Sequence, residues 1–168
     1  MNDISYEMAL KSLAIEADAI SQIINYLDKE SFSKTVDAMC KCEKVITSGC
    51  GGSGIAMEKF THSLCCIEKS SLFLSPSKAV HGGLGCVNKN DVVIVLSRAG
   101  KTSELIPIVD VAKKKGATVI TLTENTQSIL AKKADIVVPF KVERESDKLN
   151  IMTTSSFIIA AALCDAFL

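Results

Sequence analysis

The feature that most restricts the fold is a short aliphatic run that stops abruptly in a small loop. Residues 92–96, Val-Val-Ile-Val-Leu, contain no polar side chain, which is typical of a strand buried on both faces of a sheet. The loop that follows, residues 97–102, reads Ser-Arg-Ala-Gly-Lys-Thr. Apolar residues then recur at helical spacing, at Leu105, Ile108, Val109 and Ala112. The sequence therefore predicts a strand, a tight loop and a helix that begins near residue 103.

The same alternation of strand and helix runs through most of the chain. Further aliphatic runs predict strands at residues 44–48, 71–74, 119–122 and 135–139, and helical segments lie between them. Buried, aliphatic strands that alternate with helices indicate a parallel α/β sheet, here with five strands.

The composition fits one globular domain of 168 residues. The 19 basic and 19 acidic residues balance, which argues against a nucleic-acid binder that depends on a basic surface. No apolar run approaches the ~20 residues that span a bilayer, and the first residues do not resemble a secretory signal, so we expect a cytoplasmic protein without a membrane partner. The 7 cysteines form no C-x-x-C pair, which argues against a disulfide framework or a zinc ribbon.

The first 43 residues are expected to form a helical region rather than a separate domain. Apolar residues spaced three and four apart predict a helix from residue 4 to about residue 28. Ser31 is predicted to cap a second, short helix that runs through Cys40. We expect residues 1–43 to pack on the sheet-containing part, residues 44–168, or to supply a surface for a second subunit.

The loop at residues 97–102 has the chemistry of an anion site. It offers the hydroxyls of Ser97 and Thr102, a close backbone approach at Gly100 and the free N–H groups of a helix N-terminus. Because a helix N-terminus also carries partial positive charge, these donors suit a phosphate group. The alternative is an ordinary turn in which Thr102 or Ser103 only caps the helix.

A second glycine loop, Gly49-Cys50-Gly51-Gly52-Ser53-Gly54, follows the first predicted strand. Its glycines match the G-x-G-x-x-G pattern of dinucleotide-binding folds. Such a fold should also place an acidic residue at the end of its next strand, whereas here that strand ends in Ser75-Pro76. We therefore interpret the loop as a backbone-lined turn for a smaller ligand, with Ser53 as a hydroxyl donor. A tight turn without a ligand is the alternative.

Two more polar stretches complete the candidate site. Glu145 lies in a polar loop after the last predicted strand, and Thr153-Thr154-Ser155-Ser156 opens the last helix. Ligands of open parallel sheets bind beyond the carboxyl ends of the strands, and these stretches and both glycine loops all follow strands. His81, beside a glycine turn, suits proton transfer near neutral pH, whereas His62 is expected to be structural. The alternatives are that the Thr-Ser run only caps the helix, that Glu145 is a solvated loop charge and that His81 makes only a local structural contact.

These segments resemble the sugar isomerase (SIS) domain family. The resemblance rests on strand-GCGGSG-helix, AVHGGLG, VVIVLSRAGKTSE and the TTSS run before an alanine-rich helix, and it covers about Val45 to the C-terminus. It is closest to the isomerase domain of the arabinose-5-phosphate isomerases. The resemblance implies a three-layer αβα sandwich of the flavodoxin or Rossmann type, assembled as a homodimer or homotetramer. It also implies a phosphorylated sugar as the ligand, with no cofactor and no metal.

By this resemblance the chain is expected to be an isomerase that interconverts an aldose phosphate and a ketose phosphate through an enediolate. Glu145 would be the base that removes the proton beside the carbonyl, and His81 would assist ring opening or proton relay, within the chain or across a subunit interface. The other implied site residues contact the sugar or its phosphate: Gly51, Gly52, Ser53, Ser97, Arg98, Gly100, Lys101, Thr102, Thr154 and Ser155, with Ser156 nearby.

The chain departs from the arabinose-5-phosphate isomerases at two of these positions. Gly52 stands where they carry a lysine, and Lys101 stands where they carry an acidic residue, so Lys101 could supply the positive charge from another loop. Hexulose-phosphate isomerases of the same superfamily also resemble this Gly-Lys-Thr pattern. The alternative function is a non-catalytic module that binds a phosphosugar in order to sense it. Both functions need the phosphate loop, but only the enzyme needs a carboxylate within reach of the sugar carbons.

Overall fold

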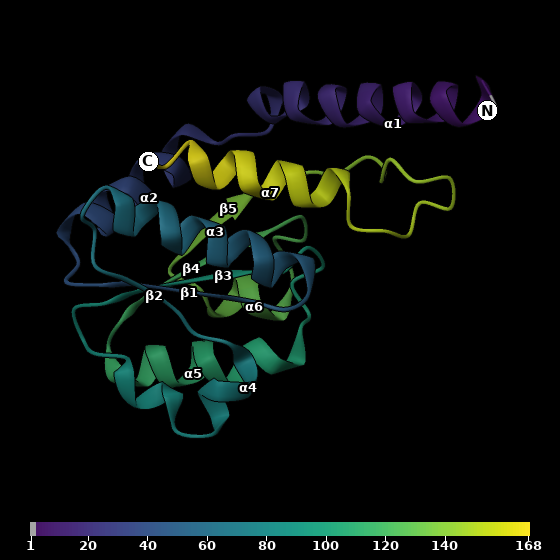
Figure 1. The fold of residues 1–168 in the computed structure, drawn as a ribbon. Helices are drawn as coiled ribbons and strands as arrows, with labels where there is room; N and C mark the ends of the chain where they lie inside the picture. Colours follow the sequence, from purple (N-terminus) through teal and green to yellow (C-terminus); the bar gives the residue numbers. More distant parts are fainter. Residues whose placement is uncertain (1–2) are drawn as a thin grey trace.

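The structure, a computed structural model that describes residues 3–168, contains a sheet of five parallel strands (Figure 1). The strands lie in the order β2-β1-β3-β4-β5. Their bounds are Val45–Gly49 for β1, Ser71–Phe73 for β2, Val92–Leu96 for β3, Thr118–Thr123 for β4 and Ile136–Pro139 for β5. The predicted five-stranded parallel sheet is confirmed, with strand ends within one residue of the predicted ones.

Helices cover both faces of the sheet and make a three-layer fold, as predicted (Figure 1). On one face lie α2 (Lys29–Lys41), α3 (Gly52–Cys66) and α7 (Ser155–Asp165); on the other lie α4 (Pro76–Val80), α5 (Ile106–Lys115) and α6 (Ile129–Lys133). Residues of β3 alternate between two buried apolar clusters, because Ile94 packs toward α3 and α7 whereas Val93 and Val95 pack toward α5. Burial on both faces explains why this strand is aliphatic throughout.

The strand order has a reversal between β1 and β3. From β1 the chain adds β2 on one side, and it then returns to add β3 on the other side of β1. In open α/β sheets, ligands bind beyond the carboxyl ends of the strands at such a reversal point. The loop after β1 and the loop after β3 therefore meet at the expected edge.

The N-terminal helices differ in two respects from the prediction. A short 3₁₀ turn at Gln22–Asn25 follows α1 (Asp3–Ser21), so the first α-helix ends earlier than expected. The predicted Ser31 cap of α2 is wrong, since the cap is Asp28. Its backbone is extended, and its carboxylate accepts a hydrogen bond of 2.7 Å from the Ser31 amide, so α2 begins two residues before Ser31.

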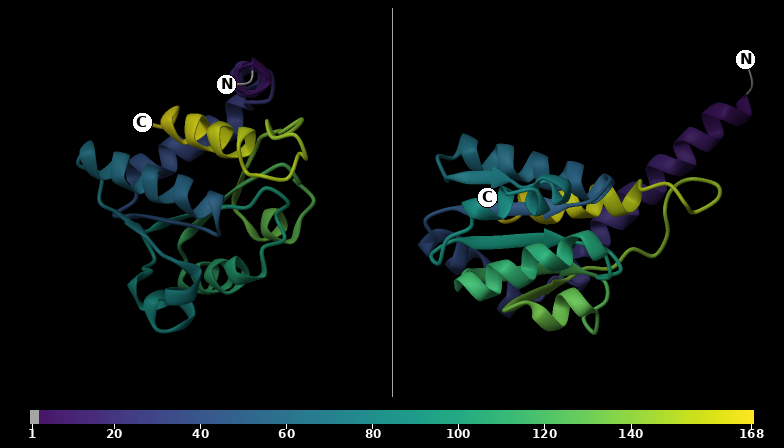
Figure 2. Two further views of the ribbon diagram at one scale, coloured as in Figure 1. Left: turned by 45° about the vertical axis from the view of Figure 1, so that its right-hand side comes forward. Right: turned by 90° about the horizontal axis from the view of Figure 1, so that it is seen from below.

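α1 packs along α7 and extends past the rest of the molecule (Figure 2). None of its residues from Asp3 to Ser21 is buried, and it carries exposed apolar side chains such as Ile4, Tyr6 and Leu13. A role of this helix at a subunit interface stays a prediction. Two further 3₁₀ turns lie at Gly83–Cys86 and Ser103–Leu105, the second of which leads into α5. Within residues 3–168, no helix combines the length and hydropathy needed to cross a bilayer.

Candidate functional site

The loop after β1 brings the start of α3 close to the sheet. Gly51 has a φ of +57°, a conformation that favours glycine, and α3 begins at the next residue. A Cβ added to Gly54 would lie 2.8 Å from the carbonyl oxygen of Gly49. A tight turn and a close contact between strand and helix thus account for the glycine pattern, and β2 runs into Leu74 rather than into an acidic residue.

The loop after β3 is closed by hydrogen bonds within itself and to α6. The N–H of Gly100 donates to the carbonyl of Ser97 at 3.0 Å, and the carbonyl of Gly100 accepts from the N–H of Leu130 at 3.2 Å. The hydroxyls of Ser97 and Thr102 are hydrogen-bonded to each other at 2.8 Å, and Ser97 is buried. The Thr102 hydroxyl therefore bonds to Ser97 and does not cap the 3₁₀ turn that follows.

We expect Gly100→Ala to destabilise the fold by about 2 kcal/mol, seen as a lower midpoint of urea denaturation. Gly100 has a φ of +66°, and an added Cβ would overlap the side chain of Ser128. Gly51→Ala is the control that separates these two causes, because its φ is +57° but no atom of residues 3–168 outside its chain neighbours lies within 4 Å of the added Cβ. Equal losses in the two variants would rule out the overlap as a cause.

A narrow pocket of about 30 Å³ opens between the glycine loop, the end of β3 and the start of α7. It is lined by Gly52, Ser53, Leu96, Arg98, Phe140, Thr153, Ser156, Phe157 and Ala160. A Cβ added to Gly52 would lie 3.1 Å from the hydroxyl oxygen of Thr153, so these two loops face each other at close range. Arg98 also borders an open hollow of about 380 Å³, together with Ala99, Lys101, Glu124 and Asn125.

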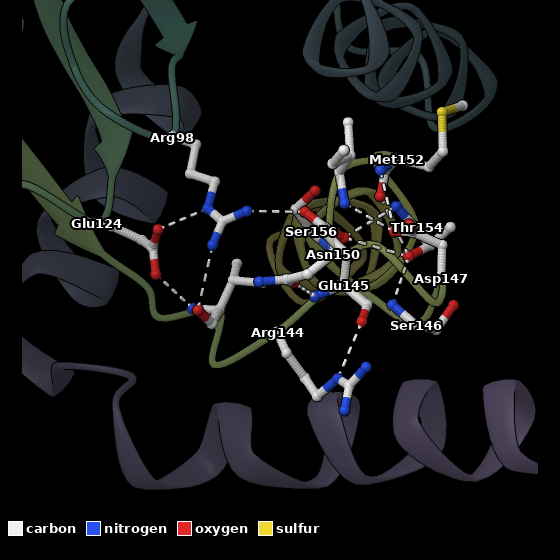
Figure 3. A network of polar contacts seen from close by, with 12 residues as sticks. Arg98, Glu124, Arg144, Glu145, Ser146, Asp147, Asn150, Met152, Thr154 and Ser156 are labelled. Atoms are coloured by element: carbon white, nitrogen blue, oxygen red, sulfur yellow. Dashed lines mark hydrogen bonds and ion pairs between the residues drawn. The ribbon is translucent and has the colours of Figure 1, made fainter.

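Arg98 is held by three groups of the protein (Figure 3). Its Nε donates to Oε2 of Glu124 at 2.6 Å, its Nη1 donates to Oε1 of Glu145 at 2.8 Å, and its Nη2 donates to the carbonyl of Val142 at 3.2 Å. These contacts use three of the five N–H donors of a guanidinium. The remaining donors could serve the predicted contact with a ligand in the pocket that Arg98 lines.

Glu145 is buried, with 2% of its surface exposed, and its carboxylate accepts hydrogen bonds from both sides. Oε1 accepts from Arg98, whereas Oε2 accepts from the amides of Thr154 and Ser156 at 2.9 and 3.0 Å and from the Thr154 hydroxyl at 3.2 Å. Burial raises the pKa of Glu145, but the hydrogen bonds from Ser156 and Thr154 and the charge of Arg98 outweigh it and hold that pKa below its ordinary value. The carboxylate is therefore ionised at neutral pH and occupies the N-terminus of α7.

The loop between Glu145 and α7 is fixed by its own side chains and by α1. The carboxylate of Asp147 accepts from the amides of residues 149, 151 and 152. The hydroxyl of Ser146 accepts from the Ser12 hydroxyl at 2.8 Å and donates to a Glu16 carboxylate oxygen at 2.7 Å. The N-terminal helix is thus attached to the residue next to Glu145.

His81 lies apart from the other predicted site residues. It is exposed at the C-terminal end of α4, on the opposite face of the sheet from α7 (Figure 1). A role for His81 beside Glu145 therefore requires a second subunit or a rearrangement of the chain, and it stays a prediction. His62 is also exposed, and its Nε2 lies 3.5 Å from the Sγ of Cys66 on the same helix.

The structure brings most of the predicted ligand contacts to one edge of the sheet. Gly52, Ser53 and Arg98 line the narrow pocket, and Lys101 borders the open hollow. Thr154 contacts Glu145 and accepts a hydrogen bond from the Ser146 amide, while Ser155 is fully buried. The neighbours of these two residues, Thr153 and Ser156, line the pocket.

Several residues of this edge were not singled out in the sequence. They are Glu124, Phe140, Val142, Asn150 and Phe157. Glu124 could have been found, because it follows β4 directly as Ser97 follows β3, and polar residues at the carboxyl ends of strands are candidates in such sheets. The two phenylalanines follow no motif, and their place in the pocket comes from the packing of α7 on the sheet.

Comparison with known proteins identifies a matching protein family and several relatives of the chain. The family model of the SIS domain matches residues 38–168. The arabinose 5-phosphate isomerases of Pseudomonas aeruginosa and Escherichia coli K12 are 31% identical over 159 residues and 32% identical over 155 residues, which cover 94% and 92% of this chain. The alignments cover 48% and 47% of those proteins, so the chain spans about half the length of the curated relatives it matches.

Solved structures agree with this relationship. A sugar-phosphate isomerase candidate from Listeria monocytogenes is 39% identical with a TM-score of 0.96, and the match covers 99% of this chain and 88% of that chain. A protein of Escherichia coli CFT073, solved in complex with a phosphosugar, is 29% identical with a TM-score of 0.88, and the match covers 99% of this chain and 92% of that chain. The sheet order, the loops at its carboxyl edge and these matches lead to one conclusion: the chain belongs to the SIS domain family.

Proposed function

We propose that the chain binds a phosphorylated sugar at the edge between β1 and β3 and interconverts its aldose and ketose forms through an enediolate. The observation that carries the proposal is the buried carboxylate of Glu145, whose Oε1 lies 2.8 Å from Nη1 of Arg98, a residue that lines the pocket. The names of the curated relatives, arabinose 5-phosphate isomerases that match over about half their length, support the same reaction class.

The loop after β3 is proposed to hold the phosphate. Its candidates for this contact are the paired hydroxyls of Ser97 and Thr102, the backbone around Gly100 and the exposed ammonium of Lys101. The backbone of Gly51 and Gly52 and the hydroxyl of Ser53 would then contact the sugar from the loop after β1. Thr154 and Ser155, at the start of α7, are proposed to contact the sugar or its phosphate from the edge of the site.

The carboxylate of Glu145 is proposed to take the proton from the carbon beside the carbonyl and to return it to the former carbonyl carbon, while the hydroxyl proton passes from the oxygen of the first carbon to the former carbonyl oxygen. Oε1 accepts a hydrogen bond from Arg98 alone among the described residues 3–168, whereas Oε2 accepts three hydrogen bonds. A carboxylate oxygen has about two lone-pair sites, so Oε1 is the atom with room for a proton. His81 is proposed to assist ring opening or proton relay from another subunit of a homodimer or homotetramer.

The test is proton NMR of the purified chain in deuterated water with a panel of pentose and hexose phosphates. We expect deuterium to appear at the carbon beside the carbonyl of at least one of them, because an enediolate exchanges that proton with solvent. The active sugar would also name the substrate. If no sugar phosphate shows exchange but several still raise the melting temperature of the chain, the isomerase proposal is wrong and the binding module is favoured.

We expect Thr102→Val to weaken binding of the active sugar phosphate about tenfold, because it removes one of the two paired hydroxyls at the proposed phosphate position. Isothermal titration calorimetry gives the affinity. Thr118→Val is the matched control, since Thr118 is also half-buried but begins β4 at the opposite end of the strands. An unchanged affinity in Thr102→Val would place the phosphate elsewhere.

A non-catalytic phosphosugar-binding module is the second candidate. It is favoured by the position of Glu145 at the N-terminus of α7, because that contact orders the loop whether or not a reaction takes place. Such a module would bind sugar phosphates at the same loop and would show no exchange in deuterated water.

A further inference from the structure

Glu124 is a charged residue at the same edge of the sheet, and it has no role in the proposed reaction. It follows β4 directly and is half-buried, and its two carboxylate oxygens have different partners. Oε2 accepts from Nε of Arg98 at 2.6 Å, and Oε1 accepts from the amide of Val142 at 2.5 Å. Glu124 thereby connects the loop after β3 with the segment that leads from β5 to Glu145 (Figure 3).

Both partners of Glu124 belong to the hydrogen-bond network around Glu145. Arg98 donates to Glu145 with Nη1 and to the carbonyl of Val142 with Nη2. Since the guanidinium is planar and rigid, fixing Nε on Glu124 also sets the direction in which Nη1 points. The backbone is fixed in the same place, because the carbonyl of Arg98 accepts from the Glu124 amide at 3.0 Å and from the Thr123 hydroxyl at 3.0 Å.

We propose that Glu124 is a positioning residue of this site: by fixing the guanidinium of Arg98 and the amide of Val142, it holds the carboxylate of Glu145 in place beside the pocket. The inference rests on the proposed isomerase function. Glutamine cannot replace Glu124, because both partners are donors and an amide side chain has a single acceptor oxygen. Its NH₂ group would face either Arg98 or Val142, and one of these contacts would be lost.

The test compares Glu124→Gln with Glu143→Gln, which removes the same charge from an exposed carboxylate close to Glu145 in the chain. A displacement of a reacting group by about 1 Å can slow a reaction about 100-fold. With the sugar phosphate that the wild type isomerises, we therefore expect Glu124→Gln to lower kcat about 30-fold, with KM changed less than about threefold. Glu143→Gln should stay within about twofold of the wild type for both.

The double variant shows whether Glu124 acts through Arg98. Lysine at position 98 keeps the charge but cannot contact both carboxylates and the Val142 carbonyl with a planar fork, so Arg98→Lys should also lower kcat. Adding Glu124→Gln to Arg98→Lys should then lower kcat by less than about threefold more. Full additivity would overturn the proposed action through Arg98, because the contact of Glu124 with the Val142 amide would then have to account for the whole loss.

The remaining outcomes separate this inference from the proposed function. An active wild type with an unaffected Glu124→Gln overturns the positioning role and leaves the isomerase standing. No exchange by the wild type overturns the isomerase and, with it, this inference. If Glu124→Gln does not fold, Glu124→Asp decides, because the shorter side chain keeps the charge and both acceptor oxygens but cannot reach Arg98 and Val142 together. A kcat within about twofold of the wild type overturns the proposal, and a loss of about tenfold or more with little change in KM supports it.

Discussion

Replacing Glu145 with glutamine is expected to lower the rate of deuterium incorporation into the active sugar phosphate by about 1000-fold. A positioned general base contributes about 100- to 10,000-fold, and glutamine of nearly the same shape cannot take the proton. The affinity for the sugar phosphate should change much less, because the proposed phosphate contacts lie on the loop after β3. Exchange rates by NMR and affinities by calorimetry on the same samples give both quantities.

Glutamine also disturbs the structure around position 145, and the experiment must separate this effect from chemistry. Both oxygens of Glu145 accept from donors, so the NH₂ group of glutamine would face Arg98 or the start of α7. We expect a loss of about 1–3 kcal/mol in the free energy of unfolding, with the variant still folded at 25 °C. Glu143→Gln is the control for the loss of charge. A folded Glu145→Gln that keeps exchange within about tenfold of the wild type would show that another group removes the proton.

The arrangement of the sheet could be predicted because its signal is local. Val92 to Leu96 are buried on both faces, which favours an apolar residue at every position of β3, and the aliphatic run ends with the strand at Leu96. The start of α2 could not be fixed in the same way. Asp28 and Ser31 are both good N-cap residues, and the extended backbone at Asp28, which the sequence does not show, decides between them.

The edge at which the candidate site lies could also be predicted, since parallel strands share a carboxyl edge and the loops after β1 and β3 both begin there. The partners within it could not. Arg98 and Glu145 are 47 residues apart in the chain, and no periodicity or motif connects them. Their ion pair depends on how the segment after β5 folds back toward β3, which is a property of the packed chain.

Single residues of the predicted site show the same limit. A hydroxyl at the start of a helix can cap it or can face a neighbour, and Thr102 faces Ser97. His81 follows a short helix on the face of the sheet away from α7, and the glycine turn beside it carries no information about that face. The type of residue at a strand end thus predicts at which edge of the sheet the candidate site lies. The direction of each side chain depends on tertiary contacts.

Replacing Arg98 with methionine is expected to destabilise the chain by about 3 kcal/mol at pH 7. The substitution keeps an unbranched side chain but leaves Glu124 and the buried Glu145 without the cation that they share. Urea denaturation measures the loss. Lys34→Met is the matched control, because it removes the cation of an exposed pair with Glu30 and should cost less than about 0.5 kcal/mol.

The destabilisation caused by Arg98→Met should depend on pH, because the ionisation of Glu145 changes with pH. Because the pKa of Glu145 is lowered in the folded protein, its ionised form stabilises the fold above the unfolded-state pKa of about 4.3, and this stabilisation is lost as the pH falls through the folded-state pKa. Without Arg98 the buried carboxylate has a higher pKa, so the penalty of Arg98→Met is largest at neutral pH and shrinks as protons bind near pH 4. Denaturation of both proteins at pH 7 and pH 4 tests this expectation. An equal difference at both values would show that Arg98 stabilises the fold by packing rather than by its charge.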